Sequence, residues 1–308
     1  MSDFTSAKAS HHHGVISVLV ALPFVSLTGL FGKFLTLSPL LIVQGRTVFA
    51  FGALLLAMLF LRKKIFFSEH REWLWLVLSG SILGVHWIAF FQAIQVSTVA
   101  IGLLSFASYP LFTTLLEPLF FREPLRVRNV FAALIVICGL TLMATSSSDD
   151  SNTIISGSVF HGILWGLMAG FGFAVLTLLN RGHVRKHSAL LITCWQNGFA
   201  ALVILPWSLS ESWIISGKEL GLLFILGVVC TVGGHTLLIN GLRHVRAQVA
   251  SMLIAGLEPV FAILFALFLL GEVPSLQTLL GGVLIMSTTV FIIYGTEQKE
   301  IPEQAVSK

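Results

Sequence analysis

The sequence predicts an all-α integral membrane protein, with ten transmembrane helices arranged as two five-helix repeats of inverted topology. The composition, a series of apolar segments and a weak internal repeat lead to this fold class. Of the 308 residues, 56% are hydrophobic and only 10% are charged, whereas a soluble domain carries about 25% charged residues. The mean hydropathy of +0.93 points the same way. This composition excludes a soluble enzyme, a nucleic-acid-binding protein and a disordered chain.

Ten apolar segments follow one another along the chain, and each has about the 20 residues that a helix needs to cross a bilayer. They cover approximately residues 14–34, 39–61, 73–93, 97–121, 126–144, 158–179, 188–210, 219–241, 247–270 and 275–295. Transmembrane β-strands would be about 10 residues long and would alternate apolar with polar residues. The run from Val260 to Leu270 does not alternate, so we expect helices that contact the lipid bilayer.

The basic residues predict that both termini are cytoplasmic, because Lys and Arg favour cytoplasmic loops. With the N-terminus inside, all 18 Lys and Arg residues fall on the cytoplasmic side except Lys33, Lys218 and Arg46. The net charge of +4 and the pI of 9.2 therefore have a membrane explanation, and no nucleic-acid partner is expected. The chain is predicted to be a multi-pass protein of the inner (plasma) membrane of a bacterial cell.

Residues 74–123 align with residues 223–272, and rare residues fall in register. The matched rare pairs are His86 with His235, Pro110 with Pro259, and Glu123 with Glu272. Because each half holds five segments, the second copy would enter the membrane from the opposite side. Such inverted repeats recur in secondary transporters, whose substrate site lies near the bilayer midplane between the repeats. A duplicated bundle without a transport role is the structural alternative.

The predicted division of the chain follows from this repeat. Residues 1–144 form the first repeat, residues 145–157 a polar linker rich in Ser and Asp, residues 158–296 the second repeat, and residues 297–308 a cytoplasmic tail. The connections between the other segments are short, which leaves no room for a soluble domain. No face of a single helix indicates a dimer interface, so the oligomeric state stays open.

The chain resembles the EamA family of the drug/metabolite transporter superfamily, in its ten-helix form. The most specific match is the segment LEPVFAILFALFLLGEVPSLQTLLGGVLI, and YPLFTTLLEPLFFREPLRVRNVFAALIVICG is its looser counterpart in the first half. Arg46 in QGRTVFA is similar to an arginine often found in the second helix of this family. The resemblance implies a membrane transporter with a small-molecule substrate, often an exporter of amino acids or related metabolites.

Polar residues in the middle of apolar segments are candidates for binding or coupling, because a charge there costs about 2.5–3.5 kcal/mol on insertion scales. Glu258 lies near the middle of the ninth segment. It would meet a substrate amine or exchange a proton, or else it is a protonated carboxyl group bonded to a neighbouring helix. Tyr109 matches Glu258 across the repeat, and Ser105 lies one turn before it. Cavity lining and plain packing are both open for Tyr109.

Three further basic or titratable side chains lie within the predicted helices. His86 and His235 correspond across the repeat and would relay protons or contact an anionic substrate, unless a neighbouring helix simply satisfies each ring. Arg46 would bind a substrate carboxylate, pair internally or extend toward the interface. No metal-ligand spacing or cofactor motif is present, and a proton is the coupling ion that Glu258 would carry.

Aromatic and proline residues complete the candidate set. Trp87 and Trp165 would form part of an aromatic lining, although such rings more often pack or face lipid. Pro110 and Pro259 each remove a backbone hydrogen bond in mid-helix, so they are candidate hinges, although membrane helices also tolerate proline for packing.

The function that we expect from these observations is alternating-access transport of a small polar metabolite, most simply export of an amino acid or a relative. The sequence has no GxxxxGK[ST] loop for ATP, so a substrate or ion gradient would drive the cycle. Import and exchange of another solute, such as a nucleotide sugar, are alternatives within transport. A membrane enzyme and a channel are alternatives outside it, but the polar groups are scattered in depth and form no ring of charges.

Overall fold

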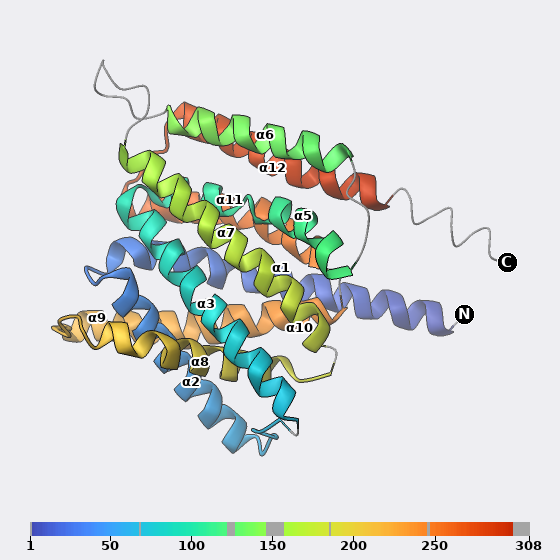
Figure 1. The fold of residues 1–308 in the computed structure, drawn as a ribbon, viewed down its shortest axis with the longest axis vertical. Helices are drawn as coiled ribbons and strands as arrows, with labels where there is room; N and C mark the ends of the chain where they lie inside the picture. Colours follow the sequence, from blue (N-terminus) through green and yellow to red (C-terminus); the bar gives the residue numbers. More distant parts are fainter. Residues whose placement is uncertain are drawn as a thin grey trace.

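A computed structural model describes residues 2–67, 69–121, 127–145, 157–184, 186–244 and 247–297. All regular secondary structure in these ranges is helical (Figure 1). Eight helices there are long and apolar enough to cross a membrane, and two shorter apolar helices cover Leu134–Met143 and Leu276–Thr288. The predicted all-helical class is therefore confirmed for the described residues, and the eight candidate spans are consistent with a membrane protein. Ten crossings in two inverted repeats remain a prediction. Most of the predicted polar linker, residues 146–156, lies outside the described residues.

The helices follow the apolar segments closely. Their bounds are α1 Ser2–Phe34, α2 Pro39–Phe60, α3 His70–Val96, α4 Val99–Phe106, α5 Tyr109–Phe121, α6 Val127–Ala144, α7 Gly157–His183, α8 Ala189–Ser208, α9 Gly217–Phe224, the π-helix η1 Ile225–His235, α10 Thr236–His244, α11 Ala247–Leu270 and α12 Leu276–Glu297. The first helix begins well before the expected residue 14, although its apolar part, His13–Phe34, matches the prediction.

The fourth apolar segment is two helices, where the sequence predicted one. The helix α4 ends in a bond from the Ala107 amide to the Leu103 carbonyl, and the Ser108 amide turns back to the Ser105 carbonyl. The Ser108 hydroxyl also donates to Ser105, at 2.7 Å. Pro110 then falls in the first turn of α5, where a missing N–H costs no intrahelical bond. The interruption therefore precedes the proline.

The eighth segment also departs from a regular helix, because η1 lies between α9 and α10. Within η1 the Thr231 hydroxyl donates to the Leu226 carbonyl, five residues earlier, at 2.8 Å. A Cβ at Gly227 would lie 2.8 Å from the Arg46 carbonyl oxygen, so α2 and η1 meet at backbone distance. Long π-helices are rare, and shorter ones are frequent at functional sites.

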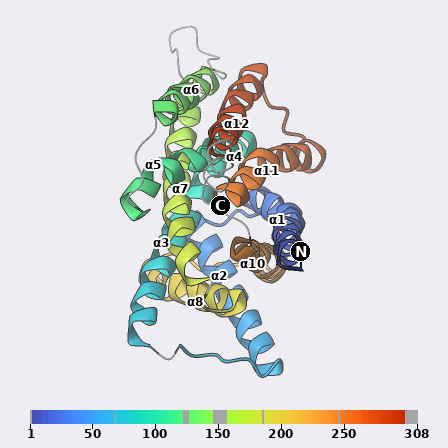
Figure 2. The same cartoon turned by 90° about the vertical axis from the view of Figure 1, so that its right-hand side faces the viewer.

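The helices form a bundle that has a different pair of helices along each of two opposite sides (Figures 1 and 2). The helices α6 and α12 lie next to each other along one side, whereas α2 and α8 lie along the opposite side, with α1, α3 and α7 between the two pairs. A Cβ at Gly139 would lie 2.8 Å from the Gly281 carbonyl oxygen, so small residues let α6 and α12 approach closely. The start of α1 and the end of α12 lie on the same side of the molecule (Figure 1).

Side-chain contacts join the two halves of the chain at the end where α1 leads into α2. The Thr36 hydroxyl donates to the Glu219 carboxylate at 2.6 Å. The Glu272 carboxylate accepts from the Val99 amide at 2.9 Å, and this amide is at the positive N-terminus of α4. The loop after α11 is thereby fixed to the start of α4.

The opposite end has its own contacts between the halves. The Glu72 carboxylate at the start of α3 lies 3.3 Å from Nε2 of His183 and 3.5 Å from Nε2 of His187. The His183 ring also stacks on Trp75, with ring centroids 3.5 Å apart. Both ends of the bundle are thus joined by side chains from α1–α6 and α7–α12.

Candidate functional site

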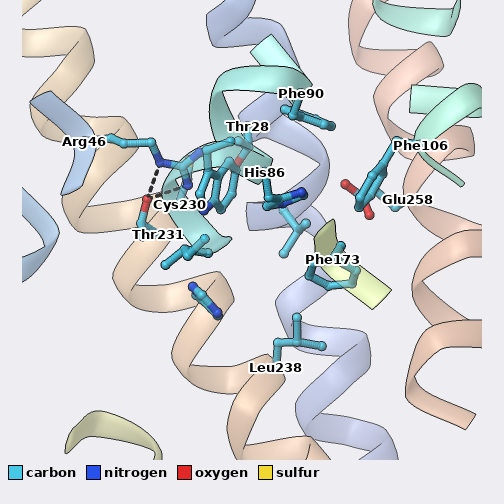
Figure 3. Close-up of a pocket in the computed structure, with 14 residues that line it drawn as sticks. Thr28, Arg46, His86, Phe90, Phe106, Phe173, Cys230, Thr231, Leu238 and Glu258 are labelled. Atoms are coloured by element: carbon cyan, nitrogen blue, oxygen red, sulfur yellow. Dashed lines mark hydrogen bonds between the residues drawn. The ribbon is translucent and has the colours of Figure 1, made fainter. Parts of the chain in front are cut away.

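A central cavity lies among eight helices, and Figure 3 shows the side chains that line it. Its lining comes from α1, α2, α3, α4, α7, η1, α10 and α11. The lining residues are Val25, Thr28, Arg46, Leu83, His86, Trp87, Phe90, Phe106, Phe173, Cys230, Thr231, His235, Leu238 and Glu258.

Arg46 brings a cation to one side of this cavity and is fully buried. Its Nε and Nη2 donate to the Thr231 hydroxyl at 3.1 and 2.7 Å. Its guanidinium carbon lies 3.1 Å from the centroid of the Trp87 ring, an arrangement that favours a cation. Nη1 has no hydrogen-bond partner, and no carboxylate in the described part of the chain pairs with the side chain. Thr231 and Trp87 therefore hold the guanidinium without neutralising it.

Thr231 can hold Arg46 because of the local geometry of η1. The threonine hydroxyl donates its proton to the Leu226 carbonyl, so its oxygen is free to accept from the guanidinium. The close approach at Gly227 brings this turn of η1 against α2. The π-helix thus sets the position of the arginine.

Glu258 lies on the other side of the cavity from Arg46, with His86 between them (Figure 3). It is only 2% exposed. The Ser26 hydroxyl donates to its backbone carbonyl at 3.3 Å, but its carboxyl group makes no hydrogen bond or ion pair with any residue that the structure describes. The alternative for Glu258, a carboxyl group bonded to a neighbouring helix, is therefore not seen among those residues.

The two histidines that correspond across the repeat both line this cavity. Nδ1 of His86 lies 2.8 Å from the Ala169 carbonyl oxygen. Because a carbonyl can only accept, Nδ1 carries the proton, and Nε2 of the neutral ring is an acceptor. Nδ1 of His235 is buried without a described partner. The cavity therefore has hydrogen-bonding groups besides Arg46 and Glu258.

The remaining wall is aromatic. Phe106 lies 5.4 Å from both Phe90 and Phe173, measured between ring centroids. Trp87 continues this surface, 6.0 Å from Phe90. These rings pack edge to face and form an apolar wall beside the polar groups, which suits a substrate with an apolar part.

Five of the candidate residues from the sequence thus meet at one cavity: Arg46, His86, Trp87, His235 and Glu258. Pro259 lies next to Glu258 inside α11, which continues through it as a helix.

The other candidates lie outside the cavity lining. Tyr109 is fully buried and packs behind the wall, with ring centroids 5.2 Å from Phe106 and 4.8 Å from Phe173. Ser105 is buried in α4 and packs against α7, because a Cβ at Gly166 would lie 2.6 Å from the Cβ of Ser105. Trp165 is half-buried against the core. Of these three side chains, Tyr109 is the one that contacts lining rings.

Some lining residues were absent from the sequence-based set, and Thr231 is the most important of them. It lies between Gly227 and Gly234, where η1 packs closely against α2 and α1. Nothing in the sequence showed the π-helix that turns Thr231 toward Arg46. Thr28 and Phe106 are common residue types in apolar segments, so they carried no signal.

A family comparison identifies the kind of protein that carries this cavity. The EamA-like transporter family model matches residues 12–145 and 160–294, most of the chain. The chain belongs to this family. The resemblance inferred from the sequence is thereby confirmed.

Relatives of this EamA-like chain are also named as transporters. The uncharacterized transporter YwfM of Bacillus subtilis is 26% identical over 240 residues, which cover 76% of this chain and 79% of the relative. The S-adenosylmethionine uptake transporter of Rickettsia conorii is 27% identical over 226 residues, 72% of each protein. Family and relatives together indicate a multi-pass membrane transporter rather than an enzyme.

A protein of known crystal structure has the same fold. Its TM-score to this chain is 0.65 at 16% sequence identity, and the match covers 93% of this chain and 96% of the other. At this identity the likeness concerns the fold alone.

Proposed function

We propose that this EamA-like protein is a secondary transporter that moves an amino acid or a related metabolite by alternating access around the central cavity. The observation that carries the proposal is the cavity itself. It is lined by helices from both halves of the chain and presents Arg46 and Glu258, which form no ion pair with any residue that the structure describes. A soluble substrate would find there the charged partners that the lipid core lacks.

The proposed architecture is ten crossing helices in two inverted repeats, residues 1–144 and 158–296, with both termini in the cytoplasm. Two stretches of the chain match the family model, which supports a division into similar halves. His86 and His235, which correspond in the internal alignment, line the same cavity. An inverted repeat would let the two halves exchange conformations, which is the structural basis of alternating access.

Contacts between the halves at both ends of the bundle support a cycle of this kind. Opening toward one side would break the bonds of Glu272 and Glu219 to the first half. Opening toward the other side would separate Glu72 from His183 and His187. Both sets of contacts are formed in this structure, so each opening would break one set and keep the other.

The substrate class follows from the lining. An amino acid has a carboxylate and an ammonium group, and Arg46 and Glu258 provide opposite charges on opposite sides of the cavity (Figure 3). The Rickettsia relatives are named for S-adenosylmethionine, which also contains an amino-acid group and whose adenine ring would suit an aromatic wall. Export and uptake are two directions of one such cycle.

Counterflow in proteoliposomes tests this function. Vesicles containing the full chain are loaded with an unlabelled solute, and entry of the same labelled solute is followed without ATP. The panel contains methionine and other amino acids, S-adenosylmethionine, and a nucleotide sugar. We expect saturable entry of an amino-acid-type solute that depends on the internal load. Folded protein that moves no solute of the panel would contradict the proposal, and movement of the nucleotide sugar alone would support the alternative exchanger.

A further inference from the structure

The cavity holds a charge that none of the residues described in the structure neutralises. Arginine keeps its proton in proteins and has five N–H groups. Thr231 accepts from Nε and Nη2, which leaves both N–H groups of Nη1 and one of Nη2. Burial of an unpaired ion is unfavourable by several kcal/mol, so buried charges are normally paired. The Trp87 face compensates only part of this.

No described side chain forms an ion pair with Arg46 or accepts from Nη1. Among the cavity-lining residues Glu258 is the acidic one, and it makes no ion pair with Arg46. Figure 3 places the two on opposite sides of the cavity. The free edge of the guanidinium, formed by Nη1 and Nη2, has the fork geometry that binds a carboxylate through two parallel hydrogen bonds. An anion of that shape would satisfy the donors that the fold leaves without partners.

We propose that the cavity has two charge subsites and selects zwitterions: Arg46 binds the substrate carboxylate, and Glu258 binds the substrate ammonium group. The assignment rests on the proposed transport function and specifies its site. Thr231 is a positioning residue. It accepts hydrogen bonds from Nε and Nη2 of Arg46 and thereby orients the free edge of the guanidinium toward the cavity. The aromatic wall of Phe90, Phe106 and Phe173 receives the apolar part of the substrate.

This assignment explains why the two ionisable groups stay apart. If Arg46 and Glu258 paired directly, the cavity would be electrically satisfied without substrate, and a ligand would first have to break the pair. Because they are separated, a substrate that carries both charged groups finds a free partner for each. A molecule with one charge leaves the other residue unpaired, and an unpaired buried charge weakens its binding.

Three small molecules that differ by one group test the two subsites. Methionine carries both charges, 3-(methylthio)propylamine lacks the carboxylate, and 4-(methylthio)butanoate lacks the amine. Their affinities for the purified full chain are measured by competition against labelled methionine. For the native protein we expect each single-charge compound to bind at least about 10-fold more weakly than methionine, since each leaves one buried charge unpaired.

Variants assign each subsite. Arg46→Gln should lower the affinity for methionine about 30-fold or more, which is the range for removing one partner of a buried charge pair. It should leave the affinity for the amine unchanged. Glu258→Gln should lower the affinity for methionine and leave the affinity for the acid unchanged. Arg62→Gln, at an exposed loop position, is the matched control and should change none of the three. Thermal unfolding of each variant in detergent checks that it is folded, and Arg46→Lys provides a second variant that retains the charge.

The outcomes separate this inference from the transport function. Equal losses of methionine and amine binding in Arg46→Gln would make Arg46 structural and overturn the carboxylate subsite. Equal binding of the acid and methionine to the native protein would reduce the site to an anion site. Counterflow of a solute with neither group, with no methionine binding, would overturn the two-subsite assignment while leaving transport intact. Absence of all transport would instead count against the proposed function.

Discussion

Glu258→Gln should abolish flux driven by a proton gradient while counterflow at saturating substrate continues. The Glu258 carboxyl group lies in the cavity and makes no bond to the described residues, so it is available to a proton or to a substrate ammonium group. Because one carboxyl group cannot hold both, proton and substrate would compete, and this competition couples their movements. Glutamine keeps the size of the side chain but cannot change protonation state, so it would remove coupling without blocking the conformational cycle.

The experiment compares proteoliposomes of both proteins with and without an imposed pH gradient. The solute is the one that the native protein moves in counterflow, used well above its half-saturating concentration because the variant should bind it more weakly. Glu69→Gln is a matched control, since Glu69 is exposed and makes no side-chain cap at the start of α3. Flux in Glu258→Gln that still responds to the gradient would show that another group carries the proton. Equal flux without any gradient response in both proteins would make the protein a facilitator.

Gly166→Val should destabilise the fold strongly, by about 3 kcal/mol, which is the upper part of the range for overpacked sites. A Cβ at Gly166 would lie 2.6 Å from the Ser105 Cβ and 3.1 Å from the Gly102 carbonyl oxygen. These are backbone or near-backbone atoms, so a rotamer change cannot relieve the overlap, and α7 would have to move away from α4. That movement would disturb Phe106 and Phe173, which face each other across the same contact.

Gly52→Val provides the matched control for this effect. Gly52 is also inside a helix, α2, but a Cβ there would meet no atom within 4 Å. We expect a clear drop in the unfolding temperature in detergent, and lower recovery of monodisperse protein, for Gly166→Val and little change for Gly52→Val. Similar unfolding temperatures for the two variants would show that α7 and α4 pack less closely than the structure describes.

Hydropathy was sufficient to locate the helices, because a helix that crosses lipid must be both long and apolar. The ninth segment, expected at residues 247–270, coincides with α11. The interruption before Tyr109 was not predictable in the same way. Proline marked the region, but the break depends on Ser108, whose amide and hydroxyl both turn back to Ser105. The π-helix η1 had no local signal at all, since its residues are ordinary for an apolar helix.

The polar candidates were found in the sequence because charge inside an apolar segment is costly. That argument selected Arg46 and Glu258, and the structure places both at one cavity. Symmetry was a weaker guide, because Tyr109 corresponds to Glu258 but packs one layer behind the wall. Which residues face the cavity depends on how the helices cross, and crossings such as α2 on η1 depend on glycines whose partners are far away in sequence.

The accessibility of Cys230 tests the central claim, alternating access to this cavity, most directly. Cys230 lines the cavity, and Cys138 and Cys194 would be replaced by serine so that one thiol remains. A small, charged, membrane-impermeant thiol reagent is applied to right-side-out and to inside-out vesicles, with and without the solute that shows counterflow. We expect Cys230 to be modified from both faces of the membrane, and more slowly when the solute is bound. Modification from one face only, or at a rate that the solute does not change, would contradict the account.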